Sequence, residues 1–389
     1  MTPEPPVLHR RLQAIVTSIS NTSLTLSKSF PEHGLPTETV PFDYLIYALG
    51  SHLPMPLNLW SIDASGNPVP SKPTKKGRQL PVYHGIKTQG IEWMKEHQKI
   101  VEDAPTVLVV GGGALGIQFA TDIANVHPTK QVTLLHSRKR LLPRFDEGMH
   151  TEILNALYSF DNIDVILGER LDLASVEEDK TSDSGQRIVR TLAGREIAAD
   201  LVLLCTGQSP NTGLLKELHP ATVNPGDGLA HVLRTLQLGV LPAPQTSTDK
   251  LEASLKQVTL SDSAPKADVE VTLQETPYPH IFVVGDAADA FGAIPAGGNA
   301  YYQGEVAARN VLRLIKRSEG ASEADEPLEL YSPLPPAIKV SLGLDKAVIQ
   351  FMDGSIHHKS DIPHDLAAST MWPLYGIDVK DENDPRMYD

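Results

Sequence analysis

Apolar runs separated by polar, glycine-containing turns recur along most of this 389-residue chain. Residues 106–110 form the most regular run, which is typical of a strand buried on both faces of a parallel sheet. Similar runs occupy residues 132–135, 163–167 and 200–207. A helix is predicted over residues 114–125, because its apolar residues recur at helical spacing. Its expected inward positions are Ile117, Ala120, Ile123 and Ala124. These strands and this helix together predict a βαβ arrangement around a parallel sheet.

Weaker patterns surround this unit. Residues 12–30 alternate apolar and polar positions, which predicts a β-hairpin that turns near Asn21-Thr22. Residues 42–50 and 280–286 each predict a buried strand that ends near a glycine. The other expected elements are a helix over 88–103 with Ile91, Met94, Ile100 and Val101 packed, a polar hairpin over 171–198, a helix over about 298–316 and a strand over 347–351. Loops are predicted over 61–81 and 239–267, and a linker over 317–326.

Composition narrows the class of protein. The chain is 41% hydrophobic and 21% charged, which is ordinary for a globular protein, and its length suits two or three domains. The net charge of −14 disfavours a nucleic-acid partner, because phosphate binding needs clustered cations. No apolar run is long enough to span a bilayer, and the first residues do not form a signal peptide. We therefore expect a cytoplasmic protein, with membrane or mitochondrial association as the alternative.

A single cysteine, Cys205, limits the chemistry further. One cysteine excludes an internal disulfide, a Cys-x-x-Cys redox pair and a cysteine-rich zinc site within one chain. The histidines form no metal-binding spacing, and neither a nucleophile elbow nor a P-loop is present. We expect no metal site, and we interpret Cys205 as a packed small hydrophobic residue of its strand.

The strongest chemical signal is Gly111-x-Gly113-x-x-Gly116, which lies between a predicted strand and a predicted helix. In dinucleotide-binding folds the first glycine permits the turn, the second admits the pyrophosphate, and the third lets helix and strand pack closely. The pyrophosphate then lies at the helix N-terminus, which here is formed by Ala114 and Leu115. The alternative is a glycine-rich turn that binds nothing.

The residues about 20 positions beyond the motif select the cofactor in this fold. His136 stands there, followed by Ser137, Arg138, Lys139 and Arg140, with no carboxylate to bind a ribose 2′-hydroxyl. Cations at this place favour NADP(H), or tolerance of both nucleotides. The alternative is that these charges form a solvated loop.

Two segments echo each other: residues 43–50 and 200–207 each run from an aspartate through apolar residues to a glycine. The echo suggests two copies of one unit. The second copy is preceded by the glycine motif, whereas residues 1–50 contain no Gly-x-Gly-x-x-Gly. We therefore expect that the first copy lacks its opening βαβ unit, as in a chain truncated at its N-terminus.

The ordered segments FDYLIYALG (42–50), VLVVGGGALGIQFA (107–120), VTLLHSRKRLLPRFD (132–146), DLVLLCTGQSPNT (200–212) and IFVVGDAADA (281–290) resemble the pyridine nucleotide-disulfide oxidoreductase superfamily. The chain is most similar to its apoptosis-inducing-factor-like branch, with its NAD(P)H:quinone oxidoreductases. The resemblance implies an α/β fold with two nested Rossmann-like domains, the FAD domain being incomplete at its N-terminus, and a small C-terminal α+β region. The implied boundaries are 1–87 with 208–316 for FAD, 88–207 for NAD(P)H, and 317–389 for the C-terminal region.

The resemblance also implies roles for individual residues. Asp286, after Gly285, would bond a hydroxyl of the FAD ribitol chain, its alternative role being a helix cap. The helix beginning near Asn299 and Ala300 would direct its amides at the flavin. Leu49-Gly50 would run beside FAD, and Gly207, after Thr206, beside the nicotinamide.

The implied activity is hydride transfer from NAD(P)H to FAD and electron transfer to a small quinone-like acceptor, with no general acid or base assigned. The chain departs from the family pattern at Leu49, which is usually Thr, and at Gln118, which is often Glu, and it lacks the redox cysteine pair. Two alternatives stay open: a non-catalytic NAD(P)H-binding remnant, or incomplete gene model, unable to hold FAD; and a flavin-free Rossmann dehydrogenase. The sequence identifies neither the acceptor nor the oligomeric state.

Overall fold

The computed structural model describes residues 9–54, 56–57, 77–241, 276–320, 326–364, 366–379 and 384. Most of the predicted loops over 61–81 and 239–267, and residues 321–325 of the predicted linker, lie outside the described residues. The chain divides into two compact units. The first comprises Met1–Ser51 and Pro210–Leu334, and the second comprises His52–Ser209 and Pro335–Asp389.

The second unit is built on a four-stranded parallel sheet in the order β11-β6-β7-β8. Its strands are β6 (Thr106–Val110), β7 (Gln131–His136), β8 (Ile163–Leu167) and β11 (Leu201–Leu204). All four residues of β6 from Val107 to Val110 are buried, as expected for a strand covered on both faces. Because the strands are parallel, Val110 and Leu204 end side by side and the turns that follow them lie at one edge of the sheet.

Helices cover this sheet. They are α1 (Lys87–Asp103), α2 (Ala114–Val126), α3 (Glu147–Tyr158) and the short α4 (Leu173–Glu177), and a hairpin of β9 (Arg187–Arg190) and β10 (Glu196–Ala199) follows. The predicted inward face of α2 is confirmed, since all four of its residues are buried. In α1 the prediction for Met94 is wrong, because its side chain is exposed, while Trp93 and His97 are buried and stack on each other. The sequence pattern did not predict α3.

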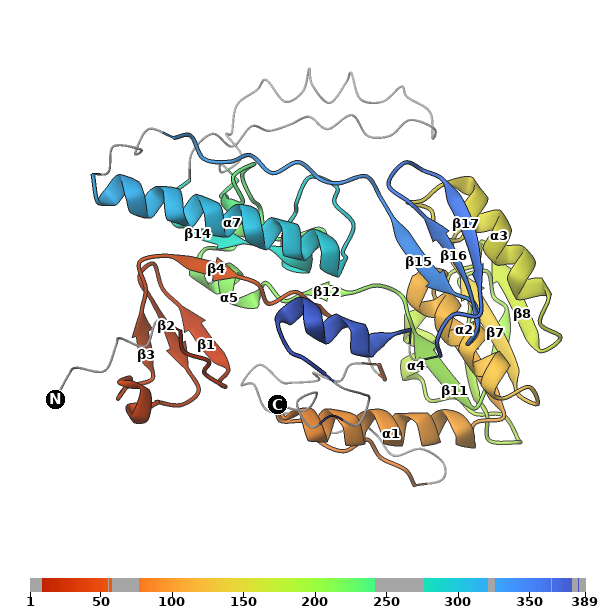
Figure 1. The fold of residues 1–389 in the computed structure, drawn as a ribbon. Helices are drawn as coiled ribbons and strands as arrows, with labels where there is room; N and C mark the ends of the chain where they lie inside the picture. The colour runs from red at the N-terminus through yellow and green to blue at the C-terminus, as the bar shows by residue number, and fades with distance from the viewer. Residues whose placement is uncertain are drawn as a thin grey trace, which may run out of the picture. The chain divides into compact units, whose positions relative to one another are not determined.

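A C-terminal antiparallel sheet completes the second unit. It consists of β15 (Ile338–Ser341), β16 (Lys346–Gln350) and β17 (Ile356–Ser360), followed by the 3-10 helix η4 (Ala368–Tyr375). Figure 1 shows the sheet beside α2 and α3, and Val340, Leu342 and Val348 belong to the same hydrophobic core as the inward face of α2. Only the central strand of the three was predicted.

The first unit contains a three-stranded sheet in the order β13-β14-β4, with β4 and β14 parallel. A second sheet, β1-β2-β3, is antiparallel and contains the predicted hairpin. The elements are β1 (Val16–Ile19), β2 (Ser23–Leu26), η1 (Pro31–His33), β3 (Thr39–Pro41), β4 (Leu45–Tyr47), α5 (Gly213–Leu218), η2 (Pro220–Thr222), β13 (Gln237–Leu238), β14 (Tyr278–Val283), η3 (Gly285–Ala287) and α7 (Gly297–Ser318). Two short strands, β5 (Ser51–His52) and β12 (Ser209–Pro210), mark where the chain passes between the units.

The mixed α/β class with a parallel sheet is confirmed. Each unit has a hydrophobic core of its own, with Phe282, Val306 and Tyr331 fully buried in the first and Leu134, Met149 and Leu203 in the second. No helix in the described ranges is long and apolar enough to cross a lipid bilayer.

Candidate functional site

The glycine turn of the second unit follows β6 and leads directly into α2. Gly111 has φ +124°, and a Cβ there would lie 2.2 Å from the carbonyl oxygen of Cys205. A Cβ at Gly116 would lie 1.8 Å from the carbonyl oxygen of Gly111. Neither position has room for a side chain, so two of the three motif glycines are required by the close approach of strand, turn and helix.

Gly113 differs from these two because it is exposed and a Cβ there would meet no atom of the described residues within 4 Å. Within the described part of the chain, no side chain caps the N-terminus of α2. The amides of Ala114 and Leu115 belong to the first helical turn, where no carbonyl of the helix is in position to accept from them. The turn therefore offers backbone N–H groups and the positive end of a helix to an open space, which fits a pyrophosphate.

His136, at the end of β7, is buried beneath this turn. Its Nδ1 accepts a hydrogen bond of 3.0 Å from the Gly112 amide, and its Nε2 lies 3.1 Å from the carbonyl oxygen of Arg140. Burial lowers the pKa of His136. The imidazole is thus neutral, and both of its nitrogens contact the protein itself. Any contact with a 2′-phosphate would therefore come from the residues that follow His136.

Those residues are Ser137, Arg138 and Lys139, and all three are exposed. Among the described residues none forms a hydrogen bond or ion pair with the Arg138 guanidinium. Arg140 instead points inward and donates to the carbonyl of Phe145. The Arg138 guanidinium therefore lies just after β7, at the position where dinucleotide-binding folds distinguish NAD(H) from NADP(H).

The segment after β11 lies beside the glycine turn, since the Cys205 amide donates to the Val110 carbonyl over 2.7 Å. Cys205 is buried, and burial raises the pKa of its thiol to about 12. The thiol is therefore protonated and not nucleophilic at neutral pH. Thr206 and Gly207 are exposed. Gly207 has φ +123°, and in the described ranges no atom lies within 4 Å of where its Cβ would stand.

In the first unit, Gly285 and Asp286 form the turn after β14. Gly285 has φ +74°, and its amide donates to the buried Gln303 over 2.7 Å. Ser51 donates to Oδ2 of Asp286 over 3.0 Å. Within the described ranges Oδ1 of Asp286 makes no hydrogen bond, so it can accept one from a ligand hydroxyl. Sequence reasoning missed Ser51 and Gln303, because partners so distant along the chain leave no local pattern.

The helix after this turn begins at Gly297, earlier than predicted. The Ala300 amide donates to the Ala296 carbonyl over 3.0 Å, which removes it from the set of free amides, and the Asn299 side chain donates to the Ile294 carbonyl. The amides without a helical carbonyl to bond are those of Gly297, Gly298 and Asn299. A Cβ at Gly297 or Gly298 would have no neighbour within 4 Å among the residues that the structure describes.

Leu49 and Gly50 follow β4 and are held by Asn211. Its side-chain amide donates to the Leu49 carbonyl over 2.8 Å, and its backbone amide donates to the Gly50 carbonyl over 2.9 Å. The Tyr47 hydroxyl in turn donates to the Asn211 carbonyl. The hydrogen bonds from Asn211 fix the backbone of this segment, whereas the Leu49 side chain is exposed.

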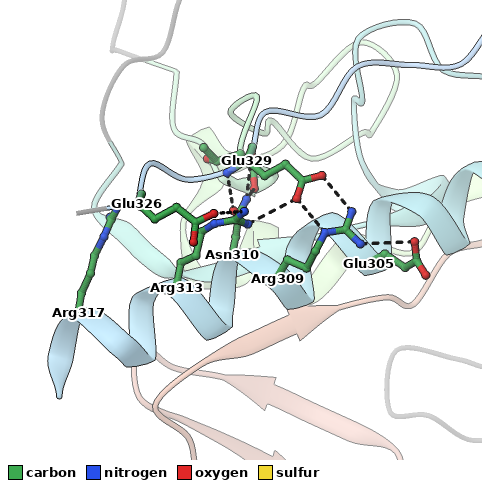
Figure 2. Close-up of polar contacts among 8 residues, drawn as sticks. Glu305, Arg309, Asn310, Arg313, Arg317, Glu326 and Glu329 are labelled. Atoms are coloured by element: carbon green, nitrogen blue, oxygen red, sulfur yellow. Dashed lines mark hydrogen bonds and ion pairs between the residues drawn. The ribbon is translucent and has the colours of Figure 1, made fainter. Parts of the chain in front are cut away.

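An extended segment, residues 326–331, makes polar contacts with α7 (Figure 2). The fully buried Asn310 donates to the carbonyls of Thr235 and Glu329 and accepts from the Glu329 amide over 2.7 Å. Arg309 holds the Glu329 carboxylate through two hydrogen bonds of 2.8 and 2.9 Å. Further along, Tyr331 bonds Gln303, which links this segment to the Gly285 turn.

Comparison with known proteins agrees with this geometry. The family model described as pyridine nucleotide-disulphide oxidoreductase matches residues 10–230. "Fe-regulated protein 8" of Mycosarcoma maydis is 39% identical over 87% of this chain and 69% of its own length. The chain belongs to the pyridine nucleotide-disulphide oxidoreductase family.

More distant relatives include "FAD-dependent oxidoreductase FVFD30" of Flammulina velutipes, which is 25% identical over 72% of this chain and 65% of its own length. "Apoptosis-inducing factor homolog A" of Dictyostelium discoideum is 22% identical over 78% of this chain and 61% of its own length. The class is therefore that of NAD(P)H-dependent flavin oxidoreductases, whose cofactors are FAD and NAD(P)H.

Solved structures share the fold. The water-forming NADH oxidase of Lactobacillus brevis, bound to NADH, has a TM-score of 0.51 and 18% identity over 86% of this chain and 57% of its own. Its engineered NADPH-bound mutant has a TM-score of 0.50 and 18% identity over the same shares. The chain thus spans between 57% and 69% of the length of these relatives.

Proposed function

We propose that this chain catalyses hydride transfer from NAD(P)H to FAD and delivers the electrons to a small quinone-like acceptor. The observation that carries the proposal is the open turn at Gly113, where backbone amides at the N-terminus of α2 face a space that no side chain of the described residues fills. When bound, FAD would accept a hydride from the reduced nicotinamide and supply the electrons for the acceptor.

The contribution of the chain itself is to bind and position. The Gly111–Gly116 turn would hold the pyrophosphate of NAD(P)H, and the exposed Gly207 segment would border the nicotinamide. In the first unit, Asp286 would accept from the ribitol of FAD, and the amides of Gly297–Asn299 would face the flavin ring system, where reduction leaves negative charge. Leu49 and Gly50, fixed by Asn211, would run beside FAD.

We further propose that NADPH is preferred over NADH. Arg138 is exposed and unengaged among the described residues, and no carboxylate stands in the segment from His136 to Arg140. The engineered mutant of the Lactobacillus brevis oxidase, which is bound to NADPH, replaces an aspartate by alanine and introduces two arginines. The same chemistry would let Arg138 pair with a 2′-phosphate.

The acceptor is proposed to be a small molecule and not a disulfide. Cys205 is the only cysteine, and its buried, protonated thiol cannot relay electrons through dithiol exchange. The resemblance to NAD(P)H:quinone oxidoreductases supports a quinone-like acceptor.

The spectrum of the purified chain tests the flavin part of the proposal. The full chain is incubated with excess FAD, gel-filtered, and titrated with NADPH under nitrogen. We expect a yellow protein that bleaches and recovers on adding a quinone, and a colourless Asp286→Ala variant. A colourless wild-type chain that still binds NADP⁺ would contradict hydride transfer and support a non-catalytic nucleotide-binding protein.

Nucleotide affinity tests the preference for NADPH. In Arg138→Ser, the loss of one charge-assisted contact should weaken NADP⁺ binding by about 10- to 100-fold. Binding of NAD⁺, which lacks the 2′-phosphate, should change less than about twofold. Lys139→Ser is the matched control that separates one specific contact from loss of any nearby charge. Equal losses for NADP⁺ and NAD⁺ in Arg138→Ser would refute the preference.

A further inference from the structure

His136 occupies the position where a dinucleotide fold normally contacts the ribose, yet its imidazole faces the protein interior. The ring is buried, and it packs so closely on Gly112 that a Cβ on that glycine would lie 2.6 Å from the ring. The Leu141 side chain would be 2.5 Å from the same Cβ. Gly112 is not one of the three motif glycines, but it must lack a side chain because His136, at the end of β7, packs against it.

Both polar groups of Gly112 are engaged by the segment that follows β7. Its amide donates to Nδ1 of His136 over 3.0 Å, and its carbonyl accepts from the Leu142 amide over 3.1 Å. Leu142 adopts φ +44°, a left-handed conformation that is unfavourable for leucine. A strained leucine persists only where its surroundings hold it, which indicates that this contact with the glycine turn is firmly maintained.

The tautomer of His136 follows from these partners. Because the Gly112 amide can only donate, Nδ1 must be the acceptor, and the proton therefore resides on Nε2, which donates to the Arg140 carbonyl. One neutral ring thus joins the glycine turn to the segment 137–142, which contains Arg138. A second proton, on Nδ1, would point at the Gly112 N–H and break that bond.

We propose that His136 is a positioning residue for nucleotide binding: its neutral imidazole holds the Gly111–Gly113 turn and the Arg138 segment in register, and its protonation releases the turn and weakens binding. The inference rests on the proposed function, since it assumes that the turn receives a pyrophosphate. It differs from a ribose contact because His136 acts through Gly112 and touches no ligand.

The surroundings of the ring favour its neutral form. Burial is the main cause that lowers the pKa of His136, and the charges of Arg138, from the following segment, and His150, from α3, lower it further. The Arg140 carbonyl acts in the opposite direction. His150 itself accepts from the Leu141 amide over 3.1 Å, so it is a second titratable group that contacts this segment.

ADP-ribose is the suitable probe, because it carries the pyrophosphate but lacks the 2′-phosphate, whose own titration near pH 6 would mask that of His136. We expect wild-type affinity, measured by calorimetry on the full chain, to fall as the pH is lowered from 7.5 to 5. His136→Leu should bind about five- to tenfold more weakly at pH 7.5. His136→Asn keeps an acceptor near Nδ1 but does not titrate, so its affinity should be near that of wild type and should not weaken with acid.

His150→Asn is the matched control, and its affinity should retain the acid-dependent fall. An acid-dependent fall that persists in His136→Asn would overturn the proposal, and so would equal losses of affinity in the Asn and Leu variants of His136.

Hydrogen exchange in the ligand-free chain gives an independent readout. The Gly112 amide should lose protection in His136→Leu and keep it in His136→Asn. Unchanged protection in His136→Leu would overturn the proposal. A different result would separate this inference from the proposed function: Gly112 protection that is lost in His136→Leu, together with a wild-type chain that does not bind ADP-ribose. The proposed function would then fail. His136 would hold the turn for the fold alone, and its positioning role in nucleotide binding would fail as well.

Discussion

At the residue scale, the glycines of one motif meet very different constraints. Gly111 and Gly116 have no room for a side chain, because backbone oxygens lie about 2 Å from where a Cβ would stand. Gly113 has an extended backbone that any residue can adopt, with φ −82°, and open space in front of it. Gly111 and Gly116 are therefore needed for folding, whereas Gly113 is needed only if a ligand approaches it.

Alanine substitutions separate these roles. Gly116→Ala should lower the free energy of unfolding by about 2–3 kcal/mol, because the helix must move away from the Gly111 carbonyl. Gly113→Ala should change stability by less than about 0.5 kcal/mol. It should nevertheless weaken NADP⁺ binding at least tenfold, because the new methyl group enters the space proposed for the pyrophosphate. Thermal unfolding and calorimetry measure the two effects, and unchanged NADP⁺ affinity in Gly113→Ala would contradict the proposed site.

At the element scale, α7 is positioned by contacts far from its N-terminus. Asn310 satisfies backbone groups of two other segments from a fully buried position, whereas Glu305 is exposed and pairs with Arg309 across one helical turn (Figure 2). Buried hydrogen bonds of this kind are costly to break, and exposed ion pairs contribute little.

Asn310→Ala should therefore destabilise the first unit by about 2–4 kcal/mol, because the Glu329 amide and two carbonyls lose their partner. Glu305→Ala on the same helix should cost less than about 0.5 kcal/mol. Denaturant unfolding followed by circular dichroism distinguishes the two. Equal, small effects would mean that water replaces the asparagine and that α7 does not depend on this contact.

The C-terminal sheet contacts the face of α2 that carries a partly buried carboxyl group. Gln118 donates to Ser341 over 3.0 Å, Asn125 accepts from the Leu344 amide, and Asp122 lies on the same face of α2 between them. One oxygen of Asp122 is buried without a hydrogen-bond partner among the described residues. Burial raises the pKa of Asp122 to about 6 from 3.8.

This pKa has a defined consequence for stability. The folded state keeps the proton up to about pH 6, while the unfolded chain releases it near pH 4, so stability falls as the pH rises through this interval. Asp122→Asn removes the cost of the buried charge. It should raise the melting temperature above pH 6 and have little effect at pH 4, whereas Asp161→Asn, at an exposed position, should show no such trend. A melting-temperature difference that is constant with pH would refute burial as the cause.

At the scale of the whole molecule, the chain forms two units, each assembled from segments distant in sequence. Each unit has its own hydrophobic core, and the candidate residues divide between them. The glycine turn, His136, Arg138 and Gly207 belong to one unit, and Leu49, Asp286 and the N-terminus of α7 belong to the other. The assignment of these units to NAD(P)H and FAD stays a prediction.

Scanning calorimetry tests that assignment. NADP⁺ at about 100 times its Kd should stabilise the unit that binds it by roughly 2.7 kcal/mol. We expect NADP⁺ to raise the temperature of the unfolding transition that Gly116→Ala shifts downward. The transition that Asn310→Ala shifts downward should respond less to NADP⁺. If NADP⁺ raises only the transition that responds to Asn310, the nucleotide binds the other unit and the assignment is wrong.

The sequence by itself determined the parallel sheet around β6, the inward face of α2 and the glycine turn, because these depend on local periodicity and on backbone constraints at single residues. It failed for Met94, where tertiary packing buries Trp93 and His97 instead, and it missed α3 and two of the three C-terminal strands. Only the tertiary structure decided that His136 faces inward, that Gln303 and Ser51 hold the Gly285-Asp286 turn, and that Asn211 fixes Leu49 and Gly50. Such contacts join residues far apart in the chain, and a side chain's partner across that distance is set by the packing of elements and leaves no trace in local sequence.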